Sequence, residues 1–229
     1  MSARRVAVVG AGIAGLACAA RLAAAGVAVT VFDKGRRPGG RLATRRLAWP
    51  QGEALVDHGA QYFTARTPGF AARCAALQAA GVLEDWQDGL SEAQASGGRA
   101  AEARYRGQPG MNALARALAS GLAVRCATEV TALERAADGW RLHCHEAAPA
   151  GGFDALAIAV PAEQAAPLLA PVAPALAAEA AAARTAPCWA GLFAYPAGTD
   201  WPDWTAWRAP PAAPLAWLAR ARAGQALVV

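Results

Sequence analysis

Three glycines near the start of the chain have the spacing of a nucleotide-binding turn. Gly10, Gly12 and Gly15 form the pattern G-x-G-x-x-G, and Asp33 follows further along. In such a turn the first glycine permits a tight bend, the second lets the backbone approach a pyrophosphate, and the third lets a helix pack closely on a strand. A downstream acid accepts hydrogen bonds from ribose hydroxyls. These residues therefore predict a site for a dinucleotide.

The glycines can do this only between two strands and a helix. Residues 6–9 form a short β-branched run typical of a buried strand, and residues 13–25 are strong helix formers that end at Gly26. Residues 27–32 form a second apolar run before Asp33. This order places a helix N-terminus, with its free N–H groups, at the phosphates. Because Asp33 would repel a 2′-phosphate, we expect FAD or NAD rather than NADP.

The same stretch could be mistaken for an export signal, since Arg4 and Arg5 precede a small, apolar run. Arg21 and the glycine spacing argue against export. A transmembrane helix needs about 20 uninterrupted apolar residues, and here the glycines and Arg21 interrupt the run. We expect no membrane-spanning segment and no membrane partner.

Composition and charge fit a globular protein. The 229 residues could form one large domain or two small ones, and alanine supplies much of the 55% hydrophobic content. The net charge of +5 indicates either a solvated surface or attraction of an anionic cofactor or substrate. No basic run is interleaved with aromatic residues, so no nucleic-acid partner is expected. The arginines cluster after the second strand, at Arg36, Arg37, Arg41, Arg45 and Arg46.

The cysteines indicate reduced thiols in a cytoplasmic protein, because they are odd in number, widely separated and without a C-x-x-C pair. His143, Cys144 and His145 resemble a metal cluster, but strand alternation would place the histidines on one face and the cysteine on the other. No further ligand stands nearby at a usual spacing, so we expect no metal. The five cysteines are Cys18, Cys74, Cys126, Cys144 and Cys188.

The rest of the chain alternates between recognisable patterns and less regular stretches. A loop is expected over residues 36–46, and the structure of residues 84–109 is not predicted. The tryptophan-rich segment 200–214 is expected to be a packed loop rather than an aromatic cage. The other expected elements are helices over 68–80 and 109–120, a strand leading into a turn over 53–66, strands over 123–126, 129–135, 140–145, 188–195 and 213–220, a doubly buried strand over 153–160, and a helix over 162–184 interrupted by Pro167, Pro171 and Pro174.

Two segments after Asp33 go beyond a general nucleotide-binding fold. "RPGGRLAT", residues 37–44, resembles the R-x-G-G-R-x-x-[ST] motif of the flavin amine oxidase superfamily. "DHGAQYFTAR", residues 57–66, resembles the D-x-G-A-Q-Y segment of renalase and its bacterial relatives. Later segments, from "GQPGMNALARAL" to "PCWAGLFAY", are similar to successive segments of the same bacterial proteins. The chain therefore resembles bacterial renalase-like FAD-dependent oxidoreductases over nearly its whole length.

This resemblance implies an α/β fold, with a glutathione-reductase-like Rossmann FAD-binding domain and a smaller α+β substrate domain built on an antiparallel sheet. The implied FAD domain covers residues 1–66 and 110–165, and the substrate domain covers 67–109 and 166–229. Family members continue for roughly another hundred residues, the length of a small domain. We therefore expect a C-terminally truncated chain that retains flavin poorly, with "LAWLAR" and "ALVV" as strands of an unfinished sheet and an unpaired edge.

The resemblance also implies the cofactor contacts, while the catalytic residues stay unknown. For Val130 and Pro161, purely structural roles in the core and at a strand end are equally open. The implied FAD contacts are Gly10, Gly12, Ala14 and Gly15 at the pyrophosphate, Asp33 and Lys34 at the adenosine ribose, Gly40 and Arg41 at the phosphates, Gly59, Ala60, Gln61 and Tyr62 at the flavin, Val130 at the adenine, and Pro161 beneath the cofactor.

A flavin carries the redox chemistry itself, so the lack of a recognisable catalytic triad or carboxylate pair fits this interpretation. Renalase-like proteins oxidise dihydronicotinamide isomers to NAD(P)+ by hydride transfer to FAD, and O2 then reoxidises the flavin to give H2O2. The resemblance implies this activity here. The alternatives are another flavin amine oxidase-like activity, a non-catalytic remnant that binds nucleotide weakly or not at all, and an NAD-dependent dehydrogenase. The dehydrogenase leaves "GGRLAT" and "DHGAQYFT" without a role.

Overall fold

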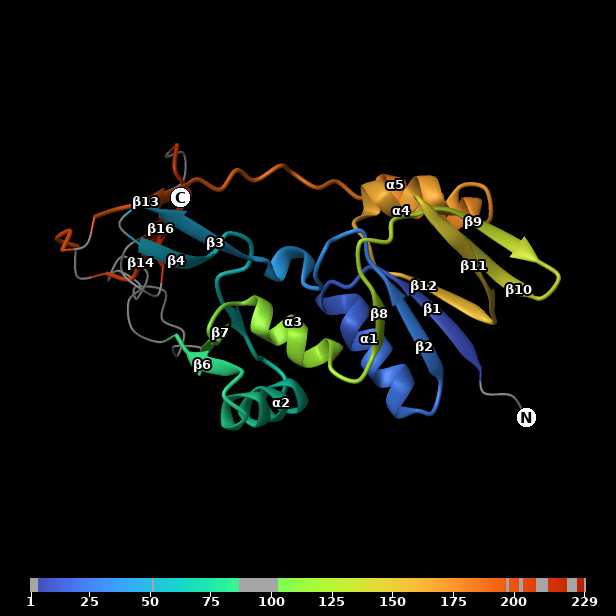
Figure 1. The fold of residues 1–229 in the computed structure, drawn as a ribbon, viewed down its shortest axis with the longest axis horizontal. Coiled ribbons are helices and arrows are strands. Elements are labelled where there is room, and N and C mark those ends of the chain that lie inside the picture. Colours follow the sequence, from blue (N-terminus) through green and yellow to red (C-terminus); the bar gives the residue numbers. More distant parts are fainter. Residues whose placement is uncertain are drawn as a thin grey trace. The chain divides into compact units, whose positions relative to one another are not determined.

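The computed structural model describes residues 4–50, 52–86, 103–196, 198–201, 204–208, 214–221 and 226–228 (Figure 1). The chain forms two compact units, each assembled from two segments. The first unit comprises Met1–Gly40 and Ala115–Pro187, and the second comprises Arg41–Leu114 and Cys188–Val229. In the described part of the chain no helix is long and apolar enough to cross a membrane.

A four-stranded parallel sheet is the centre of the first unit. Its strand order is β12-β1-β2-β8, and α1 (Ile13–Ala24) connects β1 to β2 and contacts both. Ala7 and Val8 of β1 are completely buried, because α1 contacts this strand and an antiparallel sheet packs on it. The strands are β1 (Arg5–Val9), β2 (Ala28–Phe32), β8 (Ala123–Arg125) and β12 (Ala155–Ile158).

An antiparallel sheet of three strands, in the order β11-β10-β9, packs on the parallel sheet. Phe32 of the parallel sheet meets Phe153 of β11 edge to face, with ring centroids 6.0 Å apart. The elements of this layer and the two helices that follow β12 are β9 (Val130–Ala136), β10 (Gly139–Cys144), β11 (Ala147–Phe153), α4 (Ala162–Leu169) and α5 (Pro174–Ala182). The buried residues of the shared core are Ala7, Val9, Phe32, Val130, Leu133, Leu142, Phe153 and Leu168.

Two sequence expectations for this unit need correction. β11 was not expected, because "AAPAGGF" contains proline and two glycines and lacks a β-branched residue. It forms because β10 supplies a pairing partner, with irregular register on that side. β12 was expected to be buried on both faces, but it lies at the edge of the described sheet and its residues are exposed or half-buried.

The second unit is built from antiparallel pairs. The β3–β4 hairpin packs its buried Ala54 and Val56 against Leu192 and Ala221 from the C-terminal segment. A second sheet has the order β5-β7-β6, and a third has the order β13-β16-β15-β14. The elements are β3 (Thr44–Trp49), β4 (Gly52–Asp57), β5 (Phe63–Thr64), α2 (Pro68–Ala79), β6 (Leu83–Asp85), β7 (Arg104–Gly107), β13 (Leu192–Ala194), β14 (Ala206–Arg208), β15 (Trp217–Arg220) and β16 (Ala226–Val228). Two further elements, η1 (Gly40–Leu42) and α3 (Asn112–Ala119), have residues in both units.

Three details of this unit differ from expectation. The loop expected over 36–46 contains a 3-10 turn and the start of β3, whose pairing with β4 outweighs the glycines before it. The described part of the tryptophan-rich segment contains β14, whereas residues 202, 203 and 209–213 lie outside the described residues. "LAWLAR" and "ALVV" do contain strands, but β16 pairs with both β13 and β15, so the expected unpaired edge at "ALVV" is wrong. The edge strands of this sheet are β13 and β14.

The boundaries of the two observed units also differ from the boundaries of the implied domains. The units change after Gly40, Leu114 and Pro187, whereas the implied domains change after residues 66, 109 and 165. The first difference arises because β3 and β4 pack with the C-terminal strands. The assignment of these regions to FAD and substrate domains stays a prediction.

Candidate functional site

Two of the three motif glycines are required by the fold itself. Gly10 has φ +107°, and its N–H donates a hydrogen bond to the Phe32 carbonyl at 2.7 Å. A Cβ on Gly10 would lie 2.7 Å from the carbonyl oxygen of Ala159. A Cβ on Gly15 would lie 1.9 Å from the carbonyl oxygen of Gly10. Tight turning at Gly10 and close helix-strand packing at Gly15 therefore exclude any side chain.

Gly12 differs, because the folded chain leaves room for a side chain there. It is the N-cap residue of α1, with φ −73° and ψ 178°, a conformation that any residue adopts. A Cβ on Gly12 would have no atom within 4 Å, and no side chain caps the helix. This open space at a helix N-terminus fits a pyrophosphate that approaches the backbone, because the free N–H groups and the helix dipole favour an anion.

The glycines of "RPGG" lie against this turn. The Gly39 N–H donates to the Ala11 carbonyl at 2.9 Å, and Gly39 forms a parallel bridge with Gly12. Gly40 has φ +52°, and a Cβ on it would lie 3.4 Å from the Gly12 Cα. The sequence had not indicated the pairing between Gly39 and Gly12. The next residue, Arg41, has an exposed side chain.

Asp33 supports the glycine turn directly. Its Oδ2 accepts a hydrogen bond from the Ala11 N–H at 2.6 Å, and its Oδ1 accepts one from the Gly35 N–H at 2.7 Å. A carboxylate has about four acceptor positions, so two backbone bonds leave capacity for ribose hydroxyls. Lys34 beside it is exposed.

The pKa of the Cys126 thiol depends on the charge of Asp33. Burial raises the pKa of the Cys126 thiol, and the negative charge of Asp33 raises it further. Replacing Asp33 with asparagine should therefore lower this pKa, increase the thiolate fraction at mildly alkaline pH, and speed alkylation of Cys126 by iodoacetamide several-fold. Mass spectrometry of the labelled peptides measures the rate.

Cys144 is the internal control for this measurement. Burial raises the pKa of its thiol and Arg125 lowers it, with no contribution from Asp33. Its alkylation rate should stay the same in Asp33→Asn. Equal acceleration of both cysteines would indicate loosening of the unit rather than a charge effect, and would contradict the prediction.

The family-like motifs of the second unit meet at the start of α3. The Thr44 hydroxyl donates to Asp57 Oδ1 at 2.5 Å, and that oxygen also accepts the Met111 N–H at 2.8 Å. Thr44 Oγ1 in turn accepts the Asn112 N–H at 3.1 Å. A cross-strand pair of β3 and β4 thus satisfies N–H groups at the helix N-terminus, where they lack partners within the helix.

The segment after Asp57 is held against Arg41. The Ala60 N–H donates to the Arg41 carbonyl at 2.8 Å, and a Cβ on Gly59 would lie 2.2 Å from that oxygen. The backbone of Arg41 therefore requires a glycine at position 59. Within the second unit, "RLAT" of the first motif and "DHGA" of the second form one packed structure.

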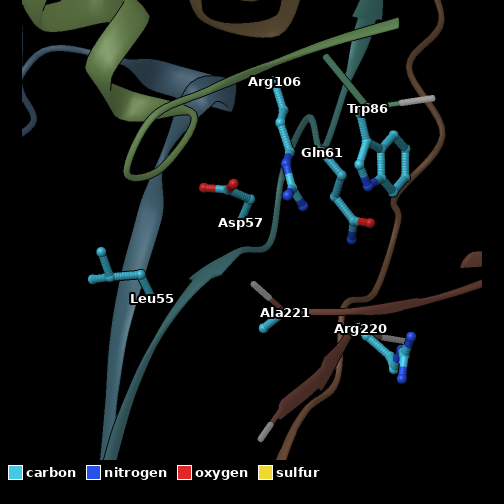
Figure 2. Close-up of a pocket in the computed structure, with 7 residues that line it drawn as sticks. All are labelled: Leu55, Asp57, Gln61, Trp86, Arg106, Arg220 and Ala221. Atoms are coloured by element: carbon cyan, nitrogen blue, oxygen red, sulfur yellow. The ribbon is translucent and has the colours of Figure 1, made fainter. Parts of the chain in front are cut away.

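Gln61 and Tyr62 enter an aromatic cluster. The Tyr62 ring lies 4.9 Å from Trp86 and 5.9 Å from Trp217, between ring centroids. Trp217 Nε1–H donates to Gln61 Oε1 at 2.7 Å. Sequence reasoning missed Trp86 and Trp217, because neither belongs to a recognisable motif. The nearby pocket shown in Figure 2 is lined by Leu55, Asp57, Gln61, Trp86, Arg106, Arg220 and Ala221.

The remaining predicted contacts occupy varied positions. Ala14 is exposed on the first turn of α1. Val130 is 8% exposed within the core of the first unit, and Pro161 is the N-cap residue of α4, so both have structural roles. Contacts of these residues with a cofactor stay predictions.

The histidine-containing strand has a structural explanation. His143 Nε2 lies 2.8 Å from Glu134 Oε2 on the neighbouring strand. Across the described ranges, no group of three or more His, Cys, Asp or Glu side chains is placed to hold a metal ion. A bulge between His143 and Cys144 interrupts the regular alternation on which the sequence argument relied.

Comparison with known families identifies the class of fold and then the family. A model described as an NAD(P)-binding Rossmann-like domain matches residues 8–75. A model described as flavin containing amine oxidoreductase matches residues 65–205, more than half of the chain. The chain belongs to the flavin containing amine oxidoreductase family, whose members are FAD-dependent oxidoreductases.

Two individual proteins extend this comparison. The zeta-carotene-forming phytoene desaturase of Myxococcus xanthus is 50% identical over 56 residues, which are 23% of this chain and 11% of that protein. The chain thus matches only about a tenth of the relative's length. A crystal structure of a candidate protoporphyrinogen oxidase from Exiguobacterium sp. 255-15 is similar, with a TM-score of 0.68 and 14% identity, over 100% of this chain and 77% of that one. This likeness shows a shared fold.

The cofactor that the family implies is FAD. The structure fits it, because the space beside Gly12 is open for a ligand to approach the backbone, and because Asp33 stands beside Ala11 at the same turn.

Proposed function

We propose that this protein is an oxidoreductase that holds the pyrophosphate of FAD at the N-terminus of α1 and oxidises a small-molecule substrate. The observation that carries the proposal is the open space at Gly12, since the fold requires glycine at positions 10 and 15 but not at 12. Folding does not require glycine at position 12. A pyrophosphate that must approach the backbone closely does require it.

The other assignments follow from this position. Ala14 and Gly15 adjoin the pyrophosphate, Asp33 and Lys34 receive the adenosine ribose, and Gly40 and Arg41 approach the phosphates. The stacking of the β9–β11 sheet and α1 on the parallel sheet supports a glutathione-reductase-like subclass. FAD supplies the electron-accepting chemistry when bound, so the protein needs to bind and orient the substrate rather than supply a nucleophile.

We further propose a renalase-like reaction, and its support is that "RLAT" and "DHGA", from the two family-like motifs, pack together within the second unit. The substrate is a dihydronicotinamide nucleotide reduced at an unusual ring carbon. It loses a hydride to FAD and leaves as NAD(P)+, and O2 accepts two electrons and two protons to become H2O2. The free cysteines of the chain favour a cytoplasmic location.

The test is to purify the full chain, add FAD, remove the excess, and record the flavin spectrum. Samples are then mixed with chemically prepared dihydronicotinamide isomers or with ordinary NADH. We expect NAD+ and H2O2 to form from the isomers much faster than from NADH. Retained flavin without turnover of the isomers would refute the substrate while keeping the cofactor. Weak retention is the sequence expectation for this chain, so the outcome that would refute the cofactor site is the absence of FAD binding with FAD in excess.

Arg41 provides a separate prediction. Arginine presents a planar fork suited to bidentate phosphate contacts, which lysine cannot reproduce. Arg41→Lys should therefore weaken FAD binding about tenfold, or about 1.4 kcal/mol, although the charge is kept. Fluorescence titration with FAD measures the affinity. Arg36→Lys, at another exposed arginine of the same cluster, should bind FAD like the parent. Equal affinity in the two variants would make Arg41 an ordinary surface charge.

A further inference from the structure

We propose that the pocket of the second unit binds an oxyanion, the carboxylate or phosphate group of a small molecule. Its lining combines an indole, an amide and two guanidinium side chains with one carboxylate, that of Asp57 (Figure 2). Gln61 is also one of the implied flavin contacts, so the inference is tested without FAD; every lining residue belongs to the second unit.

Trp86 supplies the first observation. Its side chain lines the pocket, the residue is 8% exposed, and its Nε1–H is buried without a hydrogen-bond partner among the described residues. A buried donor without an acceptor is costly. The rings of Tyr62 and Trp217 pack against Trp86 and hold the indole in place. An acceptor atom brought by a ligand would remove this cost.

Gln61 supplies a second donor. Its Oε1 accepts the Nε1–H of Trp217 at 2.7 Å. An indole N–H can only donate, so the amide oxygen must face Trp217, and the amide orientation is fixed by chemistry. The Nε2–H2 group of Gln61 is therefore left to donate on the pocket side.

Arg106 supplies guanidinium donors that are held in position by an ion pair with Glu84. Its Nε donates to Glu84 Oε1 at 2.6 Å, which anchors the side chain and leaves the terminal nitrogens of the guanidinium for other contacts. In Figure 2 these nitrogens lie between Asp57 and Gln61. Arg220 adds a positive charge beside the pocket, with its guanidinium carbon 6.0 Å from the ring centroid of Trp201.

The carboxylate of Asp57 does not remove the excess of hydrogen-bond donors in the pocket. Its Oδ1 already accepts hydrogen bonds from Thr44 and Met111. The lining therefore offers more donors than acceptors, and charge-assisted hydrogen bonds from such donors favour a carboxylate or phosphate. An ammonium group, which needs acceptors, is a poor fit.

The test uses the full chain labelled with nitrogen-15, without added FAD. The indole N–H signal of Trp86 is assigned from its loss in Trp86→Phe. The protein is titrated with inorganic phosphate, with benzoate and with propylamine, each at constant ionic strength adjusted with sodium chloride. We expect the Trp86 indole signal and the Gln61 amide signals to shift saturably with phosphate, benzoate or both, and not with propylamine. The comparison of the two anions distinguishes a phosphate site from a carboxylate site.

Two variants test the assignment of donors. Gln61→Glu is nearly isosteric and can still accept the Trp217 N–H, but it replaces the amide donors with negative charge, so anion affinity should fall at least tenfold. Arg45→Gln, which removes an exposed positive charge on β3, should change affinity less than twofold. Saturable shifts with propylamine, or no shift of Trp86 with either anion beyond the chloride control, would overturn the proposal. Unchanged anion affinity in Gln61→Glu would also overturn it.

Discussion

Replacing Gly12 with valine is expected to abolish FAD binding while the first unit stays folded. A Cβ at this position meets no protein atom within 4 Å, so the side chain enters only the space assigned to the pyrophosphate. Valine is a poor N-cap residue, and the free energy of unfolding should fall by only about 1 kcal/mol. FAD affinity should fall at least about a hundredfold, or about 2.8 kcal/mol. Flavin content after gel filtration and a urea unfolding curve measure the two quantities.

Gly12→Ser sharpens this test. Serine is among the best N-cap residues, and its hydroxyl can accept an N–H of the first turn of α1. The variant should therefore be at least as stable as the parent, yet it should bind FAD more weakly. Parent-like flavin content in both folded variants would show that no pyrophosphate lies at Gly12.

Replacing Gly15 with valine is expected to prevent stable folding of the first unit. Its Cβ would lie 1.9 Å from the Gly10 carbonyl oxygen and 3.2 Å from the Ala159 Cβ, and backbone atoms cannot move aside as a flexible side chain can. Overpacking usually costs about 1–3 kcal/mol, and this contact with backbone should exceed that range. Urea unfolding followed by circular dichroism measures the loss.

Gly69→Ala is the matched control for the second prediction. Gly69 lies in α2, and a Cβ there has no atom within 4 Å. This change should stabilise the chain by about 0.5–1 kcal/mol, because alanine favours helix more than glycine does. A Gly15→Val protein as stable as the parent would disprove the close packing of α1 on the strand. The two motif glycines thus have opposite expectations, loss of ligand at position 12 and loss of fold at position 15.

The first strand, helix and strand of the chain could be predicted because their information is local. β1, α1 and β2 follow apolar runs separated by the glycine turn, and α1 ends before Gly26, which has φ +79°. β11 could not be predicted in this way, because its residues favour no strand and its pairing with β10 decides its conformation. The position of β16 between β13 and β15 likewise depends on partners distant in sequence.

In the candidate site, too, some features follow from local sequence and others depend on residues distant in sequence. The glycine pattern and Asp33 indicated nucleotide binding directly from their spacing. The contact of Gly59 with Arg41 explains a motif that the sequence could only match to relatives. The pocket could not be predicted, because Gln61 and Trp86 meet Trp217 only after β15 has paired. The polar lining of the pocket comes from residues that are distant in sequence and meet in the folded chain, so no sequence motif indicates it.

The position of β1 within its sheet has a consequence for protein synthesis. Val6 pairs with Val29 on one side and with Ala155 on the other. A ribosome adds about 5–20 residues each second, so β1 waits roughly 7 to 30 s for the strand that covers its second edge. During that interval the nascent chain carries an open strand edge beside the future nucleotide turn. The strand that leads into the proposed cofactor site is therefore synthesised long before the strand that completes its sheet.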